Sequence, residues 1–378
     1  MKMENDLSSV DPTAAFDESA AILKGEEGGA AGELMDRFQA VTSANEVRWE
    51  IRYRLIRRLG AGGQGVVFLA DRRGAFGTTF RLALKFFRPD GYSSVTAYNS
   101  EMARLARVAT TLARIQQDHL LDLYNVIELD GLHVLTMEWV DGYGLRELLK
   151  PRTLDLVRAT MRPDRWDHVN DVVVTKSAEQ LRLKPGVATA ILRECLSGVA
   201  ALHRTGIVHA DLKPSNLMIK RTGNCKVIDF GSAFLVGQPA FRSTWTPRYA
   251  AVEVLEGAPH TPQADLASLG YMLFEMLSGQ YPFVDLMGPD LIEAKRRLPQ
   301  RLREFLPAEV ARNERLLNLI RRLIAPNPAD RFCSAEDADQ SPEGAAAFER
   351  ELVRANLSSD YANEIRLWLS EIEQERAE

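Results

Sequence analysis

The sequence is poor in cysteine, in long apolar runs and in excess basic charge, and each shortage excludes a class of protein. Its 378 residues contain three cysteines, Cys195, Cys225 and Cys333, which lie too far apart for a disulfide frame or a zinc site. No apolar run reaches the roughly 18 residues that a membrane-spanning helix needs, and the amino terminus lacks the basic-then-apolar order of an export signal. The net charge of −5 gives no polybasic signature for nucleic acid. We expect a cytoplasmic protein without a nucleic-acid or membrane partner.

What the sequence does contain is the composition of a globular protein, 46% apolar and 26% charged, with room for more than one apolar core. Residues 1–47 are rich in Ala, Gly, Glu and Asp, so we expect a flexible arm with at most one short helix near residues 34–41. We expect a main domain at 48–340, with an N-lobe at 48–138, a C-lobe at 141–340 and an insert at about 151–184. Residues 341–378 are expected to form a C-terminal helical extension.

Hydrophobic periodicity changes from strand to helix along the main domain. Alternation with a period of two begins near residue 50 and recurs in VVFLA and RLALKFF, which predicts an antiparallel meander. A helix is expected at about 95–114, followed by two strand-like runs, LLDLYNVIEL and LHVLTMEWV. From Pro185 onward the pattern is largely helical, and the last segment carries apolar helix faces with Phe348 and Trp368. We expect these faces to pack on the helical lobe, an intermolecular surface being the alternative.

Three glycines with nucleotide-binding spacing stand between two of the strand-like runs. Gly60, Gly62 and Gly65 form G-x-G-x-x-G, and glycine lets backbone amides approach phosphate oxygens because no Cβ stands in the way. A dinucleotide-binding fingerprint needs a helix directly after the last glycine, whereas here the strand-like VVFLA follows. This context favours a glycine-rich hairpin over a nucleotide, with an ordinary glycine-rich turn as the alternative.

A lysine lies inside an apolar strand twenty residues further on. A period of two places Ala83, Lys85 and Phe87 on one face of RLALKFF. Because an unpaired buried ammonium is costly, Lys85 needs an anion. Glu101, on the predicted helix, is the only glutamate between Lys85 and Glu128. We therefore expect Lys85 and Glu101 to form an ion pair.

The segment IVHADLKPSNLMIKRTGNCKVIDFG, residues 207–231, places two carboxylates beside apolar β-forming residues. Asp211 and Asp229 lie 18 positions apart, with Lys213 and Asn216 between them. Oxygen ligands of this kind suit a hard cation such as Mg²⁺.

With these motifs in this order, the sequence resembles the eukaryotic-like serine/threonine protein kinases over about residues 53–331. The correspondences are, in chain order, the glycine-rich loop at 60–67, the strand lysine Lys85, the helix glutamate Glu101, the catalytic loop at 209–216, D-F-G at 229–231, the A-P-E region in TPRYAAVEV with Glu253, and two structural anchors, Asp265 and Arg331. The resemblance implies a bilobal α+β fold, with a small antiparallel β-rich N-lobe that carries one helix and a larger α-helical C-lobe.

The resemblance also implies ATP-dependent phosphorylation of Ser or Thr hydroxyls in protein substrates, with Mg²⁺, or alternatively Mn²⁺, as the metal. By resemblance, Asp211 orients the acceptor hydroxyl and takes its proton, and Lys213 offsets charge on the transferred group. Asn216 and Asp229 are expected to hold the metal. Lysine 85, held by the helix glutamate, is expected to steer the phosphates.

For the adenine, the resemblance implies an apolar site followed by backbone contacts in the segment that joins the lobes. The residues implied are Val67, Ala83, Met137 and Met218 for the apolar site and Glu138 and Val140 for the backbone contacts. Plain core packing is an equal alternative for the four apolar side chains.

Ala210 is a departure from the family pattern, giving HAD in place of HRD and hence a non-RD type. In much of the family an arginine here pairs with a phosphate on the activation segment, through charge-assisted contacts of about 1.5–3 kcal/mol that alanine cannot make. We therefore expect activity not to depend on phosphorylation of Ser243, Thr244 or Thr246 through this position. Thr246 also matches a residue that faces substrate in Ser/Thr kinases.

Two other functions stay open at this point. A small-molecule phosphotransferase, similar to the aminoglycoside kinases, would also lack the arginine beside the catalytic aspartate, although such enzymes usually lack the glycine-rich hairpin, D-F-G and the A-P-E region. A nucleotide-binding scaffold without turnover is the third hypothesis, and the complete set of catalytic residues argues against it. We expect any regulatory partner to bind the N-terminal arm or the C-terminal helices.

Overall fold

The computed structural model describes residues 39, 42–43, 52–129, 131–237, 245–355, 357 and 359–377. By its internal contacts the chain divides into two units, residues 1–52 and 53–378, and the helices and strands below belong to the second unit. The short helix expected near residues 34–41 lies almost wholly outside the described residues.

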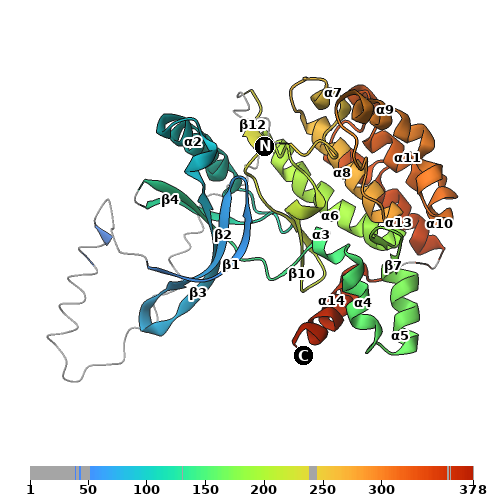
Figure 1. Cartoon of the computed structure of the whole chain (residues 1–378), viewed down its shortest axis with the longest axis horizontal. Helices are drawn as coiled ribbons and strands as arrows, with labels where there is room; N and C mark the ends of the chain where they lie inside the picture. Colours follow the sequence, from blue (N-terminus) through green and yellow to red (C-terminus); the bar gives the residue numbers. More distant parts are fainter. Residues whose placement is uncertain are drawn as a thin grey trace, which may run out of the picture. The chain divides into compact units, whose positions relative to one another are not determined.

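An antiparallel sheet of five strands opens the second unit, with neighbouring strands in the order β1-β2-β3-β5-β4 (Figure 1). The strands are β1 (Tyr53–Gly62), β2 (Gly65–Arg73), β3 (Thr79–Phe87), β4 (Leu123–Leu129) and β5 (Leu132–Met137). The predicted meander is confirmed. β3 pairs with both β2 and β5, and its residues 82–85 are buried on both faces rather than on one.

Helix α2 (Val95–Leu112) follows the third strand, close to the range expected from the sequence. It begins at Ser94, whose side chain accepts a hydrogen bond from the backbone N–H of Ala97, a favourable cap because the first amides of a helix have no partner within it. The helix packs against β4. It also packs against β12 (Phe234–Leu235), which comes just after the segment 207–231 that contains Asp211 and Asp229. α2 therefore touches both the sheet and the catalytic segment.

The rest of the unit is mainly helical, as predicted, and these helices gather away from the five-stranded sheet in Figure 1. The helices are α3 (Leu145–Leu148), α4 (Pro151–Arg158), α5 (Pro163–His168), α6 (Pro185–Arg204), α7 (Val252–Leu255), α8 (Pro262–Ser278), α9 (Gly288–Phe305), α10 (Ala308–Ala311), α11 (Glu314–Leu323), α12 (Ala335–Gln340), α13 (Ala345–Arg354) and α14 (Tyr361–Ala377). Short strands lie between them: β6 (Gly142–Gly144), β7 (Val174–Lys176), β8 (Leu181–Leu183), β9 (Ile207–Val208), β10 (Leu217–Lys220) and β11 (Cys225–Val227).

Helix α6 lies in the core of the helical region, where it contacts α8, α12 and α13. Its length and composition alone would let it cross a membrane, but 72% of its apolar window is buried inside the fold. That degree of burial is what a core helix of a globular domain shows.

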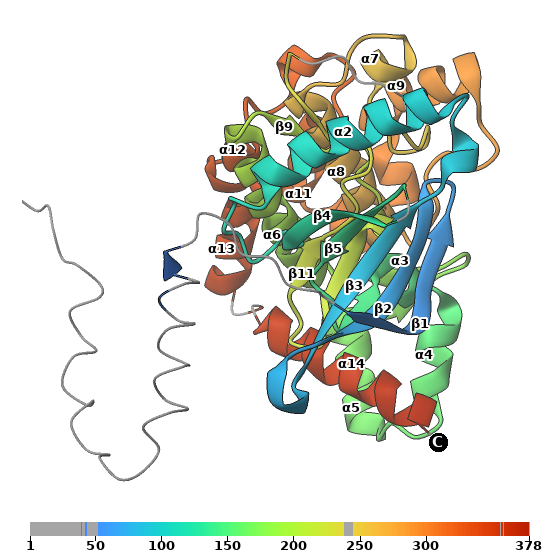
Figure 2. The same cartoon turned by 90° about the vertical axis from the view of Figure 1, so that its left-hand side faces the viewer.

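The C-terminal helices pack on the same domain as the predicted insert. Phe348 on α13 and Trp368 on α14 are 2% and 1% exposed and belong to the main core, so the expected packing on the helical lobe is confirmed. Helix α14 lies beside α4 and α5 (Figure 2), and Arg165 of α5 pairs with Glu364 at 3.0 Å and with Glu371 at 2.8 Å. The insert and the carboxyl-terminal helix therefore form one packed layer.

Candidate active site

A cleft of about 1550 Å³ lies where the β1–β2 hairpin, β3, β5 and α2 meet the segment 211–231. Every residue that the sequence analysis assigned to catalysis, nucleotide or metal lines it. These residues are Gly60, Gly62, Gly65, Val67, Ala83, Lys85, Glu101, Met137, Glu138, Val140, Asp211, Lys213, Asn216, Met218 and Asp229. The structure thus brings together residues that are as much as 169 positions apart in the chain, from Gly60 to Asp229.

The glycine-rich hairpin lies at one wall of the cleft. Gly62 pairs with Gly65 across the turn, and a Cβ on Gly65 would lie 2.0 Å from the carbonyl oxygen of Phe86, so this close approach of β2 to β3 requires glycine. Between them Gln64 points into the cleft, where its Oε1 accepts a hydrogen bond from Lys85 Nζ at 3.2 Å. The hairpin therefore contributes a polar side chain as well as its backbone.

Lys85 is buried and forms an ion pair with Asp229, the two charged atoms lying 2.5 Å apart. Burial opposes ionisation of Asp229, but the charge and hydrogen bond of Lys85 outweigh it and lower the pKa of the carboxyl group. Asp229 has a positive φ of 63°, which is uncommon outside glycine and marks a constrained backbone at a functional segment. The carboxylate is therefore ionised, and it lines the cleft beside Lys85.

The ion pair predicted between Lys85 and Glu101 is not formed in this structure. Glu101 instead accepts two hydrogen bonds from Arg104 on the same helix, at 2.8 Å and 2.7 Å. Arg104 also donates to the carbonyl oxygens of Ala233 and, at 3.1 Å, Gly231. The prediction was wrong because two cations compete for one buried carboxylate, and the arginine three residues along the helix is already beside it.

Asp211, Lys213 and Thr246 form a compact hydrogen-bonded group at the mouth of the cleft. Asp211 Oδ1 accepts from the Thr246 hydroxyl at 2.9 Å and from the Thr246 backbone N–H at 3.1 Å. Lys213 Nζ donates to Asp211 Oδ2 at 2.6 Å and to the same hydroxyl at 2.9 Å. A carboxylate and an ammonium thus converge on one side-chain hydroxyl, which is the geometry that deprotonation of an alcohol requires.

Asn216 completes the polar floor beside Asp211. Its amide nitrogen donates to the backbone carbonyl of Asp211 at 2.8 Å, which leaves its amide oxygen as a possible ligand. This oxygen and the ionised carboxylate of Asp229 line the same cleft, and a hard divalent cation prefers such oxygen donors. The residues present therefore fit a Mg²⁺ ion.

The catalytic loop is held from below by Asp265, which is fully buried on α8. Its carboxylate accepts from the backbone N–H groups of His209 and Ala210, both at 2.9 Å, and lies 3.0 Å from Nε2 of His203. Ala210 adopts a positive φ of 66° between these contacts. His203 is a structural residue, and Asp265 acts as the predicted anchor.

Ala210 packs in an apolar cluster with Val208 and Phe234, and no cation stands at this position.

Further on, Arg331 forms a bidentate pair with Glu253, both distances being 2.7 Å, so the second predicted anchor is confirmed. Ser243 and Thr244 lie outside the described residues.

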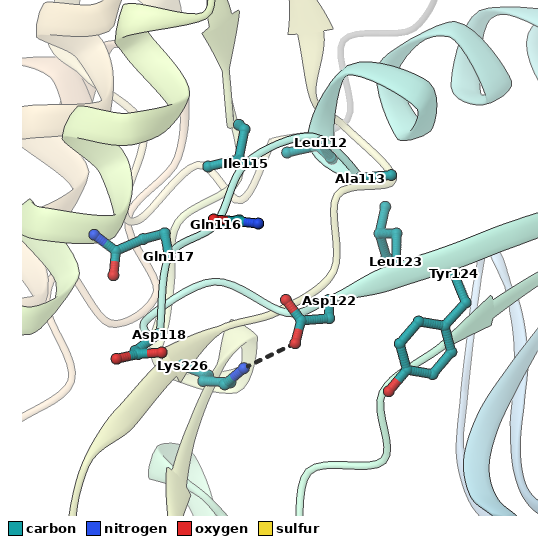
Figure 3. A pocket seen from close by; sticks show the side chains of 10 residues that line it. All are labelled: Leu112, Ala113, Ile115, Gln116, Gln117, Asp118, Asp122, Leu123, Tyr124 and Lys226. Atoms are coloured by element: carbon teal, nitrogen blue, oxygen red, sulfur yellow. Dashed lines mark ion pairs between the residues drawn. The ribbon is translucent and has the colours of Figure 1, made fainter. Parts of the chain in front are cut away.

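The segment that joins the sheet to the helices is fixed from behind by Lys226. Its ammonium group donates to Glu138 Oε2 at 2.6 Å and to the carbonyl of Leu120 at 3.0 Å, and it lies 3.8 Å from Asp122 across a smaller pocket (Figure 3). The backbone N–H of Glu138 donates to the backbone carbonyl of Asp122 at 2.9 Å. The backbone carbonyl of Glu138 is therefore the group that remains for a ligand. The smaller pocket contains none of the predicted catalytic residues.

Sequence reasoning missed three polar residues of the site: Gln64, Arg104 and Lys226. The spacing of Arg104 was a usable signal, since residues three apart on a helix are neighbours. Gln64 stands inside the glycine motif, but nothing in the sequence shows that its side chain turns inward. Lys226 alternates with apolar residues on β11, the pattern that had drawn attention to Lys85.

Comparison with known proteins agrees with this geometry. The chain matches the protein kinase domain over residues 53–342. It is 32% identical over 239 residues to the probable serine/threonine-protein kinase pknA2 of Bifidobacterium longum, covering 62% of this chain and 27% of that protein. It is 25% identical over 336 residues to the serine/threonine-protein kinase PrkC of Bacillus subtilis, covering 85% and 43%. A third relative is the serine/threonine-protein kinase PknD of Mycobacterium tuberculosis, 29% identical over 290 residues, covering 75% and 38%.

The chain thus spans less than half the length of each of these relatives. The matched domain covers well over half of this chain and includes every residue that lines the cleft described above. The chain belongs to the protein kinase family.

Proposed function

We propose that this protein transfers the γ-phosphate of ATP to Ser or Thr hydroxyls of protein substrates. The observation that carries the proposal is the convergence of Asp211 and Lys213 on the Thr246 hydroxyl. The groups that a phosphoryl acceptor needs are thereby assembled at the mouth of a cleft whose inner wall is a glycine-rich hairpin. The names of the relatives support Ser/Thr specificity, and the substrates are proteins by the same analogy.

In the proposed reaction, Asp211 accepts a hydrogen bond from the acceptor hydroxyl and takes its proton as the oxygen attacks. Lys213 stabilises the negative charge that develops between that oxygen and the phosphoryl group. Lys85 contacts the phosphates of the nucleotide, and the hairpin glycines let backbone amides approach them. Val67, Ala83, Met137 and Met218 enclose the adenine, with the Glu138 carbonyl and the Val140 amide as its polar contacts.

Asn216 and Asp229 are the residues that would hold Mg²⁺, or Mn²⁺. When bound with ATP, the metal neutralises charge on the phosphates. Because Asp229 now pairs with Lys85, nucleotide binding requires the ammonium group of Lys85 to move from the carboxylate to the phosphates.

The central test is Asp211→Asn, which keeps the size of the side chain and removes its basicity. We expect a loss of about 10²- to 10⁴-fold in transfer, the usual contribution of a positioned base, while ATP affinity stays within a factor of a few. Labelled ATP would be offered with a generic protein acceptor and, separately, with aminoglycosides and sugars. Asp164→Asn, an exposed carboxylate on α5, is the matched control.

Transfer to small molecules alone would replace the proposal by a small-molecule phosphotransferase. Nucleotide binding without any transfer by the wild type would make the chain a scaffold. An undiminished rate in Asp211→Asn would refute the role of this carboxylate.

We further propose that activity does not depend on phosphorylation of the activation segment. The apolar contacts of Ala210 with Val208 and Phe234 support this, since a phosphate there would meet no cation from position 210. Ser243→Ala and Thr244→Ala should each leave transfer to an external substrate within about twofold, whereas a phosphate-assisted mechanism would lose the 1.5–3 kcal/mol of a charge-assisted contact, roughly tenfold or more. A collapse in either variant would contradict the proposal.

We also propose a cytoplasmic location for this domain.

A further inference from the structure

Arg248 lies two residues after Thr246, which is at the mouth of the cleft. The side chain of Arg248 is partly exposed. Its guanidinium lies over the ring of Tyr281, 5.6 Å from the centroid. Within the described part of the chain, no carboxylate forms an ion pair with Arg248. An arginine held by an aromatic face retains its planar set of donors for an anion from outside.

The backbone of Arg248 is fixed by an unusual contact. Its carbonyl oxygen accepts a hydrogen bond at 2.9 Å from Lys295 on α9, whose side chain is fully buried. The ammonium lies 3.5 Å from the ring centroid of Tyr271 and 4.5 Å from that of Phe283. Burying a lysine in this way is costly unless it is hydrogen-bonded, and the Arg248 carbonyl supplies that bond. We take the anchoring of this carbonyl as the role of Lys295.

The next residue is anchored as firmly. The Tyr249 hydroxyl donates to Glu275 at 2.5 Å, and the Tyr249 carbonyl accepts from the Ser268 hydroxyl at 3.0 Å. Thr246 is held by Asp211 on the other side of Arg248. Because the peptide units around it are clamped, the backbone of Arg248 is fixed before any ligand binds, which lowers the ordering cost of binding.

A second arginine, Arg146, lies exposed on α3, the short helix that packs against the turn at residues 214–216 of the catalytic loop. Burial raises the pKa of Glu275, and the charges of Arg146 and Arg248 both oppose that shift, so both guanidiniums lie within electrostatic reach of one carboxyl group. Glu275 itself is hydrogen-bonded by Tyr249 and by Gln180, the latter at 3.1 Å. Among the described residues, Tyr249 and Gln180, rather than the two arginines, bond the Glu275 carboxylate.

The one acidic residue of α3 is also bonded to other groups. Glu147 accepts from Lys150 at 2.5 Å and from Arg152 at 2.8 Å. Arg248 lies two residues after Thr246, which lines the cleft, and Arg146 lies on α3 beside residues 214–216, so both arginines stand near the acceptor position. The carboxylates near them are already bonded to other groups. A binding partner that supplies a carboxylate would pair with them.

We propose that Arg146 and Arg248 bind an acidic side chain of the acceptor protein, so that the enzyme selects Ser or Thr residues flanked by Asp or Glu. This inference rests on the proposed protein kinase function and names the substrate class of the same site. Arginine and carboxylate match in shape as well as in charge, since two parallel N–H groups meet two oxygens. The distance along the chain from Thr246 to Arg248 places the acidic residue within a few positions of the acceptor.

The test uses the full chain with ATP, Mg²⁺ and a series of peptides that share one Ser acceptor. Each peptide carries a single Glu, Gln or Lys at one of the positions from three before to three after the acceptor. We expect kcat/KM for the best Glu peptide to exceed that of its Gln counterpart about tenfold, the effect of one charge-assisted hydrogen bond. The Lys counterpart should be the poorest substrate, and KM for ATP should be the same throughout the series.

Charge reversal separates a recognition role from a structural one. Arg248→Glu should invert the order, so that the Lys peptide becomes better than the Glu peptide at the same position, and Arg146→Glu should weaken or invert it. Arg350→Glu, an exposed arginine on α13, is the control that should keep the wild-type order. Lys295→Met keeps the length of the side chain and removes its donor, and we expect it to reduce the Glu preference without changing KM for ATP.

The outcomes distinguish the two levels of the argument. Transfer that is indifferent to charge at every position, or an order that Arg248→Glu and Arg146→Glu together leave unchanged, overturns the specificity inference alone. Absence of transfer to any peptide or protein by the wild type overturns the proposed function and, with it, this inference. A Glu preference that inverts in the variants supports both.

Discussion

Replacing Arg104 tests whether the arginine on α2 holds the site in a non-productive arrangement. Glu101 accepts two charge-assisted hydrogen bonds from Arg104, at 2.8 Å and 2.7 Å, while Lys85 pairs with Asp229. In protein kinases generally, transfer requires the lysine of the third strand to pair with the glutamate of this helix. In this chain the arginine therefore competes with Lys85 for one carboxylate.

The change Arg104→Gln leaves at most one neutral hydrogen bond to Glu101. Losing the charged contact removes roughly 1.5–3 kcal/mol from the present arrangement, and each 1.4 kcal/mol shifts the ratio of two arrangements about tenfold. Glu101 is only 5% exposed, so its carboxylate then needs another cation, and Lys85, which is also buried, lines the same cleft. We expect kcat to rise about tenfold, with KM for ATP changed little.

The assay is steady-state transfer to a peptide, measured at a temperature where circular dichroism shows the variant to be folded, since the bonds to Gly231 and Ala233 are lost as well. Arg107→Gln, an exposed arginine on the same helix, is the control and should behave as the wild type. Glu101→Gln combined with Arg104→Gln should show no gain. A folded Arg104→Gln protein with unchanged or lower kcat would refute the reasoning and would make Arg104 a support of the productive site.

Two further predictions concern stability. Trp368→Ala should lower the free energy of unfolding by about 3–5 kcal/mol, because a large side chain that is 1% exposed leaves a cavity; urea denaturation checks this, Val353→Ala at 57% exposure serves as the control, and a loss below about 1 kcal/mol would mean that α14 docks loosely. Burial opposes ionisation of Asp265, but the hydrogen bond and charge of His203, with smaller contributions from His209 and His260, lower its pKa. The folded pKa is thus below the unfolded value of about 3.9, so this stabilisation is complete above that pH and is lost as the pH falls through the folded pKa. Thermal unfolding between about pH 2 and 5 should show a shallower acid dependence for Asp265→Asn than for wild type, and identical slopes would contradict the assignment.

The order of strands and helices was readable because local patterns and tertiary demands agree over most of the domain. The alternation in β1 to β3, the turn residues between them and the capped start of α2 each specify one local structure. Convergence of the polar residues on one cleft followed from the order of several motifs, each weak when taken alone. The packing of α14 on the insert could not be foreseen, since the ion pairs of Arg165 join residues about 200 positions apart and no local pattern encodes them.

The partner of Glu101 shows where sequence reasoning reaches its limit. The requirement that Lys85 be neutralised was correct, and the structure meets it with Asp229 instead. Glu101 had two possible cations, one across the cleft and one a single helical turn away. Pairing with Arg104 orders little additional chain, because α2 already holds both residues, whereas pairing with Lys85 requires the helix and the sheet to approach in one particular way. Sequence names both candidates, and only the balance of these two free energies decides between them.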